Sequence, residues 1–141
     1  MDIFFMLLAI LAGVFTTIEG TINSQLGKYL TPSVATLHSL IVGVVFILFL
    51  NLLSGNISKY ARVTTVSPIW LIGGLFGASI IYLSSKAIPK LGISNTLILL
   101  LAGELVSGLV VDALLNHVEI SLKKMAGMVL FLIGAIMFLQ E

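Results

Sequence analysis

Two glutamates lie in long apolar segments of this chain, Glu19 within "IEGTINSQLG" and Glu104 within "LLLAGELVSGLVVD". A charged side chain near the middle of a membrane helix costs at least about 2.5–3.5 kcal/mol, so it usually faces a bundle interior or an aqueous cavity. Loss of water favours the neutral carboxylic acid, so such a group can exchange protons near neutral pH. A cation competes with the proton for the same carboxylate. The residue types therefore predict a proton and cation site.

Small and hydrogen-bonding residues accompany both glutamates. Thr16, Glu19 and Asn23 recur at helical spacing along one side of the expected first helix. Ser107 lies about one turn beyond Glu104. This pattern predicts a polar path that admits water or substrate. The alternative is structural, with each glutamate protonated and hydrogen bonded across helices to hold the bundle together.

The composition indicates an integral membrane protein. The 141 residues are 59% hydrophobic and only 9% charged, and the mean hydropathy is +1.20, whereas an ordinary soluble domain has about 25% charged residues. About five spans of roughly 20 residues each leave too little chain for a soluble catalytic domain, so we do not expect an enzyme. The net charge of +1 argues against binding of nucleic acid.

Neither a metal site nor a cofactor is expected. The chain has no cysteine, which excludes disulfides and Cys-ligated metal. Its two histidines, His38 and His117, are expected near opposite membrane faces.

Apolar runs bounded by charges and turn residues predict a single transmembrane domain over residues 1–141. The expected helices are 3–26, 33–54, 68–88, 93–114 and 122–139. Thr31-Pro32 and Ser67-Pro68 each place a capping side chain before a proline at a first helical position. Pro89 and Gly92 are expected to separate the third and fourth helices.

The basic residues give almost no orientation bias. Lys59, Arg62, Lys123 and Lys124 are expected on the amino-terminal face, and Lys28, Lys86 and Lys90 on the other. Because lysines and arginines near the spans set orientation, this near balance predicts insertion both ways round. The alternatives are that the count is noisy or that a partner fixes the orientation. Lys86 and Asp112 lie closer to the faces and are interpreted as interface charges, with gate residues as the alternative.

The depths of the glutamates favour an inverted pair of subunits. Measured from residues 15 and 101, the middles of the two uncharged stretches, Glu19 and Glu104 are displaced by roughly 6 and 4.5 Å at 1.5 Å per residue. Their helices run in opposite directions, so the two carboxylates of one subunit lie at different depths. An inverted neighbour brings its Glu19 to about the depth of this subunit's Glu104. An antiparallel ten-helix dimer therefore gathers four glutamates around the midplane.

Two helices have glycine-rich faces that predict packing surfaces. Gly73 and Gly77 form a small-xxx-small pattern in the third helix, and such faces let two helix backbones approach closely. Gly127 and Gly134 lie seven residues apart in the last helix, which has no charge from residue 126 to 139. We expect that helix to serve packing or dimerisation, with plain lipid exposure as the alternative.

These features resemble a known family over nearly the whole chain. The five-span layout, the glycine-punctuated last helix and the segments "INSQLGKYL" and "SKAIPKLGISNTLILLLAGELVSGLVVDALLNH" resemble the half-size, five-helix bacterial branch of the drug/metabolite transporter superfamily. The resemblance implies an antiparallel two-domain unit in the bacterial inner membrane, made by a dual-topology homodimer or with an oppositely oriented paralogue. At the positions that resemble Glu19 and Glu104, that branch often has glutamine.

A more distant resemblance is to the small multidrug resistance exporters, which have four helices and work as antiparallel dimers. Their first helix carries a glutamate, a short glycine-threonine stretch and a lysine, and "IEGT" with Lys28 matches that pattern. The resemblance implies proton-coupled export of cationic or small polar compounds, with Glu19 as the site that the proton and the cation share. This chain differs from those exporters in two respects. It has a fifth helix, and it lacks the tryptophan that they carry in the pathway of their third helix, because its Trp70 lies at the start of that helix.

The predicted function is therefore a proton-coupled exporter of a small cationic or polar compound, working by alternating access in an inverted homodimer. Its partners would be the substrate, protons, membrane lipid and a second copy of the chain. Two other classes remain open. One is a non-transporting assembly or modulator subunit whose glutamates pin helices together, and the other is a passive channel.

Overall fold

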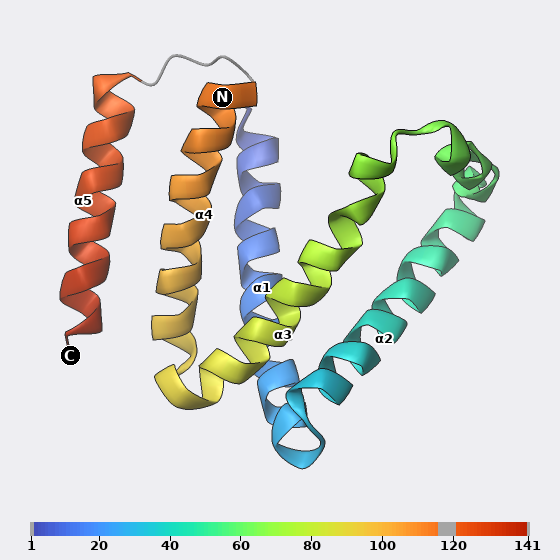
Figure 1. Ribbon diagram of the computed structural model, residues 1–141, viewed down its shortest axis with the longest axis horizontal. Helices are drawn as coiled ribbons and strands as arrows, with labels where there is room; N and C mark the ends of the chain where they lie inside the picture. The colour runs from blue at the N-terminus through green and yellow to red at the C-terminus, as the bar shows by residue number, and fades with distance from the viewer. Residues whose placement is uncertain (1, 116–120, 141) are drawn as a thin grey trace. The chain divides into compact units, whose positions relative to one another are not determined.

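The computed structural model describes residues 2–115 and 121–140, and every regular element in that part of the chain is a helix (Figure 1). Five segments are long and apolar enough to cross a membrane: Ile3–Tyr29, Pro32–Leu53, Pro68–Leu91, Ile93–Leu114 and Leu122–Leu139. The all-α class and the five expected spans are confirmed.

The described residues form five α-helices and two 3₁₀ segments. In chain order these are α1 (Ile3–Tyr29), α2 (Pro32–Leu53), η1 (Asn56–Thr65), η2 (Pro68–Ile72), α3 (Gly73–Leu91), α4 (Ile93–Leu115) and α5 (Leu122–Leu139). Of the 3₁₀ segments, η2 begins the third span and η1 lies between the second and third spans. The chain divides into two compact units, Met1–Lys90 and Leu91–Glu141. A single domain over residues 1–141 stays a prediction.

The first two helices form a hairpin with a two-residue turn at residues 30–31 (Figure 1). The Thr31 side chain accepts a hydrogen bond from the backbone N–H of Val34 at 3.3 Å, and Pro32 takes a first-turn position of α2. This start is the predicted one. Ser67 also precedes a proline, but its side chain makes no capping hydrogen bond, and the span starts there as the 3₁₀ segment η2.

Glycines with left-handed backbone end two of the helices. Gly55, with φ 67°, follows the last residues of α2, and Gly92, with φ 82°, follows α3. Pro89 does not separate the third and fourth helices as expected, because it lies inside α3, which continues to Leu91. Pro89 lacks the N–H that would bond the Ser85 carbonyl, but only two residues of α3 follow it, so a kink there displaces little of the helix.

Small and polar side chains fill the interior of the first unit. The buried residues there are Asn23, Ser24, Ala35, Thr36, Ser85 and Ile88. The Thr36 hydroxyl donates to the Pro32 carbonyl and the Ser85 hydroxyl to the Ile81 carbonyl, each at 2.8 Å. Both bonds lie within a single helix and satisfy the hydroxyls without joining helices. Large apolar side chains instead lie on the outside. Small buried residues with apolar side chains outside suit a membrane, where small residues let helices approach closely and lipid receives the apolar surface.

The Ile88 side chain of α3 contacts α1 at Gly20. A Cβ built there would lie 3.1 Å from Cδ1 of Ile88, so the missing side chain is what allows this contact. In the second unit, α4 packs against α5, and Ala135 of α5 is buried. An apolar pocket of about 380 Å³ lies between these two helices and is lined by Met125 and Met128 among others.

Candidate functional site

A short chain of hydrogen bonds links Glu19 to the second helix. The amide nitrogen Nδ2 of Asn23 donates to Oγ of Ser39 at 3.2 Å, and that hydroxyl donates to Oε1 of Glu19 at 3.4 Å. A serine hydroxyl has one donor and two acceptor sites, so Ser39 can serve both neighbours at once. The contact to Glu19 is long for such a bond, which makes it the weaker of the two. Asn23 is only 3% exposed, so the surrounding residues fix this end of the hydrogen-bond series.

The local fold explains why these three residues meet. Glu19 and Asn23 are four residues apart in α1 and so lie on the same face. Asn23 comes seven residues before the turn at residue 30 and Ser39 eight residues after residue 31, about 10.5 and 12 Å along their helices. An antiparallel hairpin with so short a turn therefore places Ser39 opposite Asn23.

Glu19 lines a surface pocket of about 340 Å³ between α1 and α2. Its polar or titratable lining residues are Glu19, Asn23, His38 and Ser39; its apolar ones are Phe15, Ile18, Ile22, Leu26 and Val42. The volume falls at the lower end of the range for small-molecule sites, which are mostly apolar with a few placed polar groups. Glu19 is exposed in the single chain, so its carboxyl group is accessible to a proton or a ligand.

Sequence reasoning missed His38 and Ser39. His38 lies six residues into α2, about 9 Å along the span, and lines the same pocket as Glu19. Its place near a membrane face stays a prediction. The available signal was the Thr31-Pro32 helix start, which fixes the turn and hence which residues of the two helices face each other. His117 lies outside the described residues.

Thr16 is not among the residues that line this pocket. Its hydroxyl donates to the carbonyl of Ala12 at 3.0 Å, within its own helix. Such a bond satisfies the hydroxyl locally and leaves its lone pairs for a further donor. A role for Thr16 in the polar path stays a prediction.

The second glutamate lies on α4, in the second unit. Glu104 is exposed, and Ser107 is exposed one turn further on. The Ser107 hydroxyl donates to the carbonyls of Gly103 and Glu104, at 2.8 and 3.2 Å. Neither Glu104 nor Ser107 lines the apolar α4–α5 pocket. Their part in a shared site with Glu19 stays a prediction.

Lys86 does not line the Glu19 pocket and pairs within α3. Its ammonium nitrogen lies 3.4 Å from the Tyr82 hydroxyl and 5.1 Å from the centre of the Tyr82 ring. A cation over an aromatic face is held by about 0.5–1 kcal/mol at exposed sites. Asp112 is half-buried on α4. The choice between interface charge and gate stays open for both residues.

The predicted packing faces have no neighbour in the described part of the chain. Apart from the backbone of the same helix and the two neighbouring residues, no described atom lies within 4 Å of a Cβ built at Gly73, Gly77, Gly127 or Gly134. Each of these faces is thus uncovered within its own unit.

No group of three or more His, Cys, Asp or Glu that could hold a metal ion occurs among residues 2–115 and 121–140. Glu19 and His38 are the two titratable residues lining their pocket. A carboxylate beside apolar walls, with Phe15 at hand for a cation–π contact, can bind a proton or an organic cation with an apolar body.

Comparison with protein families gave one match for the chain. The family model described as "Putative inner membrane exporter, YdcZ" matches residues 4–137. The matched range includes both glutamates and every residue that lines the pocket. Comparison with curated proteins and with solved structures gave no match.

Proposed function

Since the chain belongs to the YdcZ family of inner membrane exporters, we propose that it is a secondary-active transporter that exchanges protons for a small organic cation at Glu19. The family indicates a transporter rather than an enzyme, and the protein is an integral, multi-pass protein of the inner membrane. The observation that carries the proposal is the Glu19 carboxylate, held by Ser39 in an apolar-walled pocket between two spans.

Competition between proton and cation supplies the coupling. A protonated Glu19 has no charge with which to hold a cation, and a bound cation displaces the proton. If the pocket opens alternately to the two sides of the membrane, each outward passage of the cation returns a proton inward. Asn23 and Ser39 keep the carboxyl group in one position, and the apolar walls favour a substrate with an apolar body.

An antiparallel homodimer completes the proposed transporter. Two inverted copies would bring Glu19 of one chain and Glu104 of the other to similar depths, with Thr16 and Ser107 shaping the path. The glycine faces of α3 and α5, each uncovered within its own unit, suit a contact with another helix such as one of a second copy, because small residues allow close helix approach. The likeness to the small multidrug resistance exporters stays a prediction.

The function is tested in vesicles reconstituted with the purified protein and held at zero membrane potential. We expect quaternary ammonium cations, added to vesicles with an acidic lumen, to accelerate proton loss from the lumen and to accumulate inside above the external concentration. Protein-free vesicles and neutral compounds of the same size serve as controls, and an ionophore that collapses the pH gradient should abolish the accumulation. Cation entry that only equilibrates would indicate a channel, and absence of any protein-dependent flux would favour the non-transporting subunit.

Orientation is tested separately with single cysteines, which the cysteine-free chain allows without prior substitution. Ser58→Cys and Gln140→Cys mark opposite ends of an odd number of spans. We expect a membrane-impermeant maleimide to label comparable fractions of both variants from outside intact cells. Labelling of only one of them would show a fixed orientation, which removes the homodimer and requires an inverted partner subunit.

A further inference from the structure

The segment η1 separates its polar and apolar side chains by its helical period. A 3₁₀ helix has three residues per turn, so residues three apart lie one above the other. Along η1 this gives a polar, basic row of Asn56, Lys59, Arg62 and Thr65, and an apolar row of Ile57, Tyr60 and Val63. A segment with one basic and one apolar side is suited to the boundary between hydrocarbon and headgroups.

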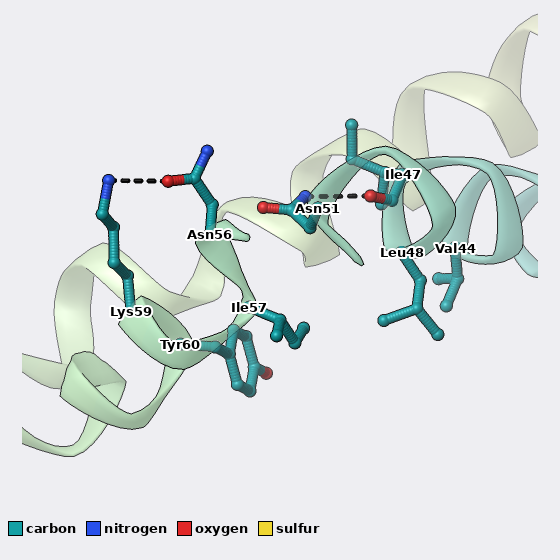
Figure 2. Close-up of a pocket in the computed structure, with 8 residues that line it drawn as sticks. All are labelled: Val44, Ile47, Leu48, Asn51, Asn56, Ile57, Lys59 and Tyr60. Carbon is teal, nitrogen blue, oxygen red and sulfur yellow. Dashed lines mark hydrogen bonds between the residues drawn. The ribbon is translucent and has the colours of Figure 1, made fainter. Parts of the chain in front are cut away.

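The apolar row of η1 meets the end of α2 in a pocket of about 640 Å³ (Figure 2). Val44, Ile47 and Leu48 of α2 line it together with Ile57 and Tyr60 of η1. Figure 2 shows the Val44 and Leu48 side chains on the same side as Ile57 and Tyr60, with Asn56 and Lys59 on the other side of η1. The pocket therefore has an apolar floor and a polar rim.

The rim of this pocket carries positive charge and hydrogen-bond donors. Lys59 and Asn56 both line the pocket, and Nζ of Lys59 donates to Oδ1 of Asn56 at 2.6 Å, which fixes the ammonium group beside η1. An ammonium group has three donors, so two remain for another acceptor. Asn51 also lines the pocket, and its amide donates to the Ile47 carbonyl at 2.9 Å. The sequence has no acidic residue between Glu19 and Glu104, so no carboxylate on α2, η1 or η2 neutralises Lys59 and Arg62.

The positions of the basic and apolar lining residues along the span indicate which kind of anion the pocket fits. Helix α2 ends at Leu53, so Lys59 and Arg62 lie beyond its end, where we expect the lipid phosphates, while Leu48 and Val44 lie about 1.4 and 2.5 turns inside the span. Tyr60 is 72% exposed, which suits an amphipathic ring at the membrane interface. A ligand of this pocket must place an anion at the interface and an alkyl chain toward the bilayer interior.

We propose that the pocket between α2 and η1 binds an anionic phospholipid, with the phosphate of its headgroup on Lys59 and an acyl chain along Val44, Ile47 and Leu48. Arg62 does not line the pocket, but it follows Lys59 by one turn in the polar row of η1 and would add a second positive charge beside the phosphate. This site is separate from the Glu19 pocket, shares no lining residue with it and does not depend on the transport function. A zwitterionic lipid offers less net attraction to the two basic side chains, and a free phosphate leaves the apolar floor unused.

The test is native mass spectrometry of the purified protein in detergent, titrated with phosphatidylglycerol and separately with phosphatidylcholine. Since each basic residue near an anionic lipid surface contributes about 1 kcal/mol, we expect about fivefold weaker phosphatidylglycerol binding for each charge removed, and about thirtyfold weaker binding for Lys59→Gln with Arg62→Gln. Phosphatidylcholine should bind the unchanged protein about as weakly as phosphatidylglycerol binds this double variant.

Two further variants separate a built pocket from general surface charge. Lys28→Gln is the matched control, because Lys28 also lies near a span end and also donates to an amide oxygen three residues earlier, Oε1 of Gln25 at 3.1 Å. It should leave phosphatidylglycerol affinity unchanged. Leu48→Trp fills the apolar floor and keeps every charge, so it should weaken binding as well. If Leu48→Trp does not yield folded protein, Val44→Trp replaces it.

Three results would overturn the proposal. Unchanged affinity in the Lys59→Gln, Arg62→Gln variant would remove the headgroup contact. Loss of affinity in that variant but not in the tryptophan variant would reduce the effect to surface attraction. Displacement of phosphatidylglycerol by millimolar inorganic phosphate would identify the ligand as the free anion rather than a lipid.

Discussion

Glu19→Gln is expected to reduce pH-driven cation accumulation in vesicles to the level of protein-free controls. Glutamine keeps the size of the side chain and can still accept a hydrogen bond from Ser39, but it neither releases a proton nor holds a cation by charge. The measurement is accumulation of a quaternary ammonium cation at zero membrane potential, with thermal stability in detergent as the check on folding. Because glutamine can also form a hydrogen bond between helices, the thermal stability in detergent should change little.

Ser39→Ala is expected to have a smaller effect than Glu19→Gln. It removes the hydroxyl between Asn23 and Glu19 and leaves the carboxylate in place. Interhelical hydrogen bonds in membranes average about 0.6 kcal/mol, so we expect about threefold weaker cation affinity with coupling retained.

Full driven transport in the Glu19→Gln variant would contradict the assignment of the carboxylate. His38 would then be the remaining titratable residue of the pocket. A loss of detergent stability in Glu19→Gln, equal at all pH values and with no change in transport, would instead identify Glu19 as a structural pin.

Ala35→Leu is expected to destabilise the first unit by about 1–3 kcal/mol, because overpacking forces side chains off their rotamers and shifts backbones. Ala35 has no accessible surface, and it lies in the first turns of α2, close to the turn that joins the hairpin. The measurement is the midpoint of thermal unfolding in detergent. Ala9→Leu on the exposed surface of α1 is the matched control, since alanine and leucine have similar helix propensity.

A midpoint that falls equally in both alanine variants would show that the effect arises from helix propensity or detergent contact. An unchanged midpoint in Ala35→Leu would mean that α1 and α2 separate easily at this point. Either result would weaken the case for a fixed Glu19, Ser39 and Asn23 arrangement, because the same hairpin positions all three.

The helices were predictable because hydropathy and length suffice to identify membrane spans. Thr31-Pro32 also gave the correct start of α2, because the capping bond forms between residues close in sequence. The predicted place of Pro89 between the helices was wrong, because a proline removes one helical hydrogen bond and does not by itself end the last turn of a helix.

Only the residues that α1 contributes to the site were predictable from the sequence. Glu19 and Asn23 follow from their spacing on α1, but Ser39 and His38 belong to the pocket through packing of α2 on α1, which their own segment does not indicate. The lipid pocket was missed for a related reason. The basic and apolar rows of η1 separate at a period of three, whereas the periodicity that identifies α-helices is 3.6.

The short turn at residues 30–31 also bears on how the site is made. Every residue that lines the Glu19 pocket lies between Phe15 and Val42, and the longest hydrogen-bonded separation in it, from Glu19 to Ser39, is 20 residues. Contacts of such low sequence separation form fast, because little loop-closure entropy is lost. The pocket is thus encoded in one helical hairpin, which can assemble during synthesis before α3 and the second unit have left the ribosome.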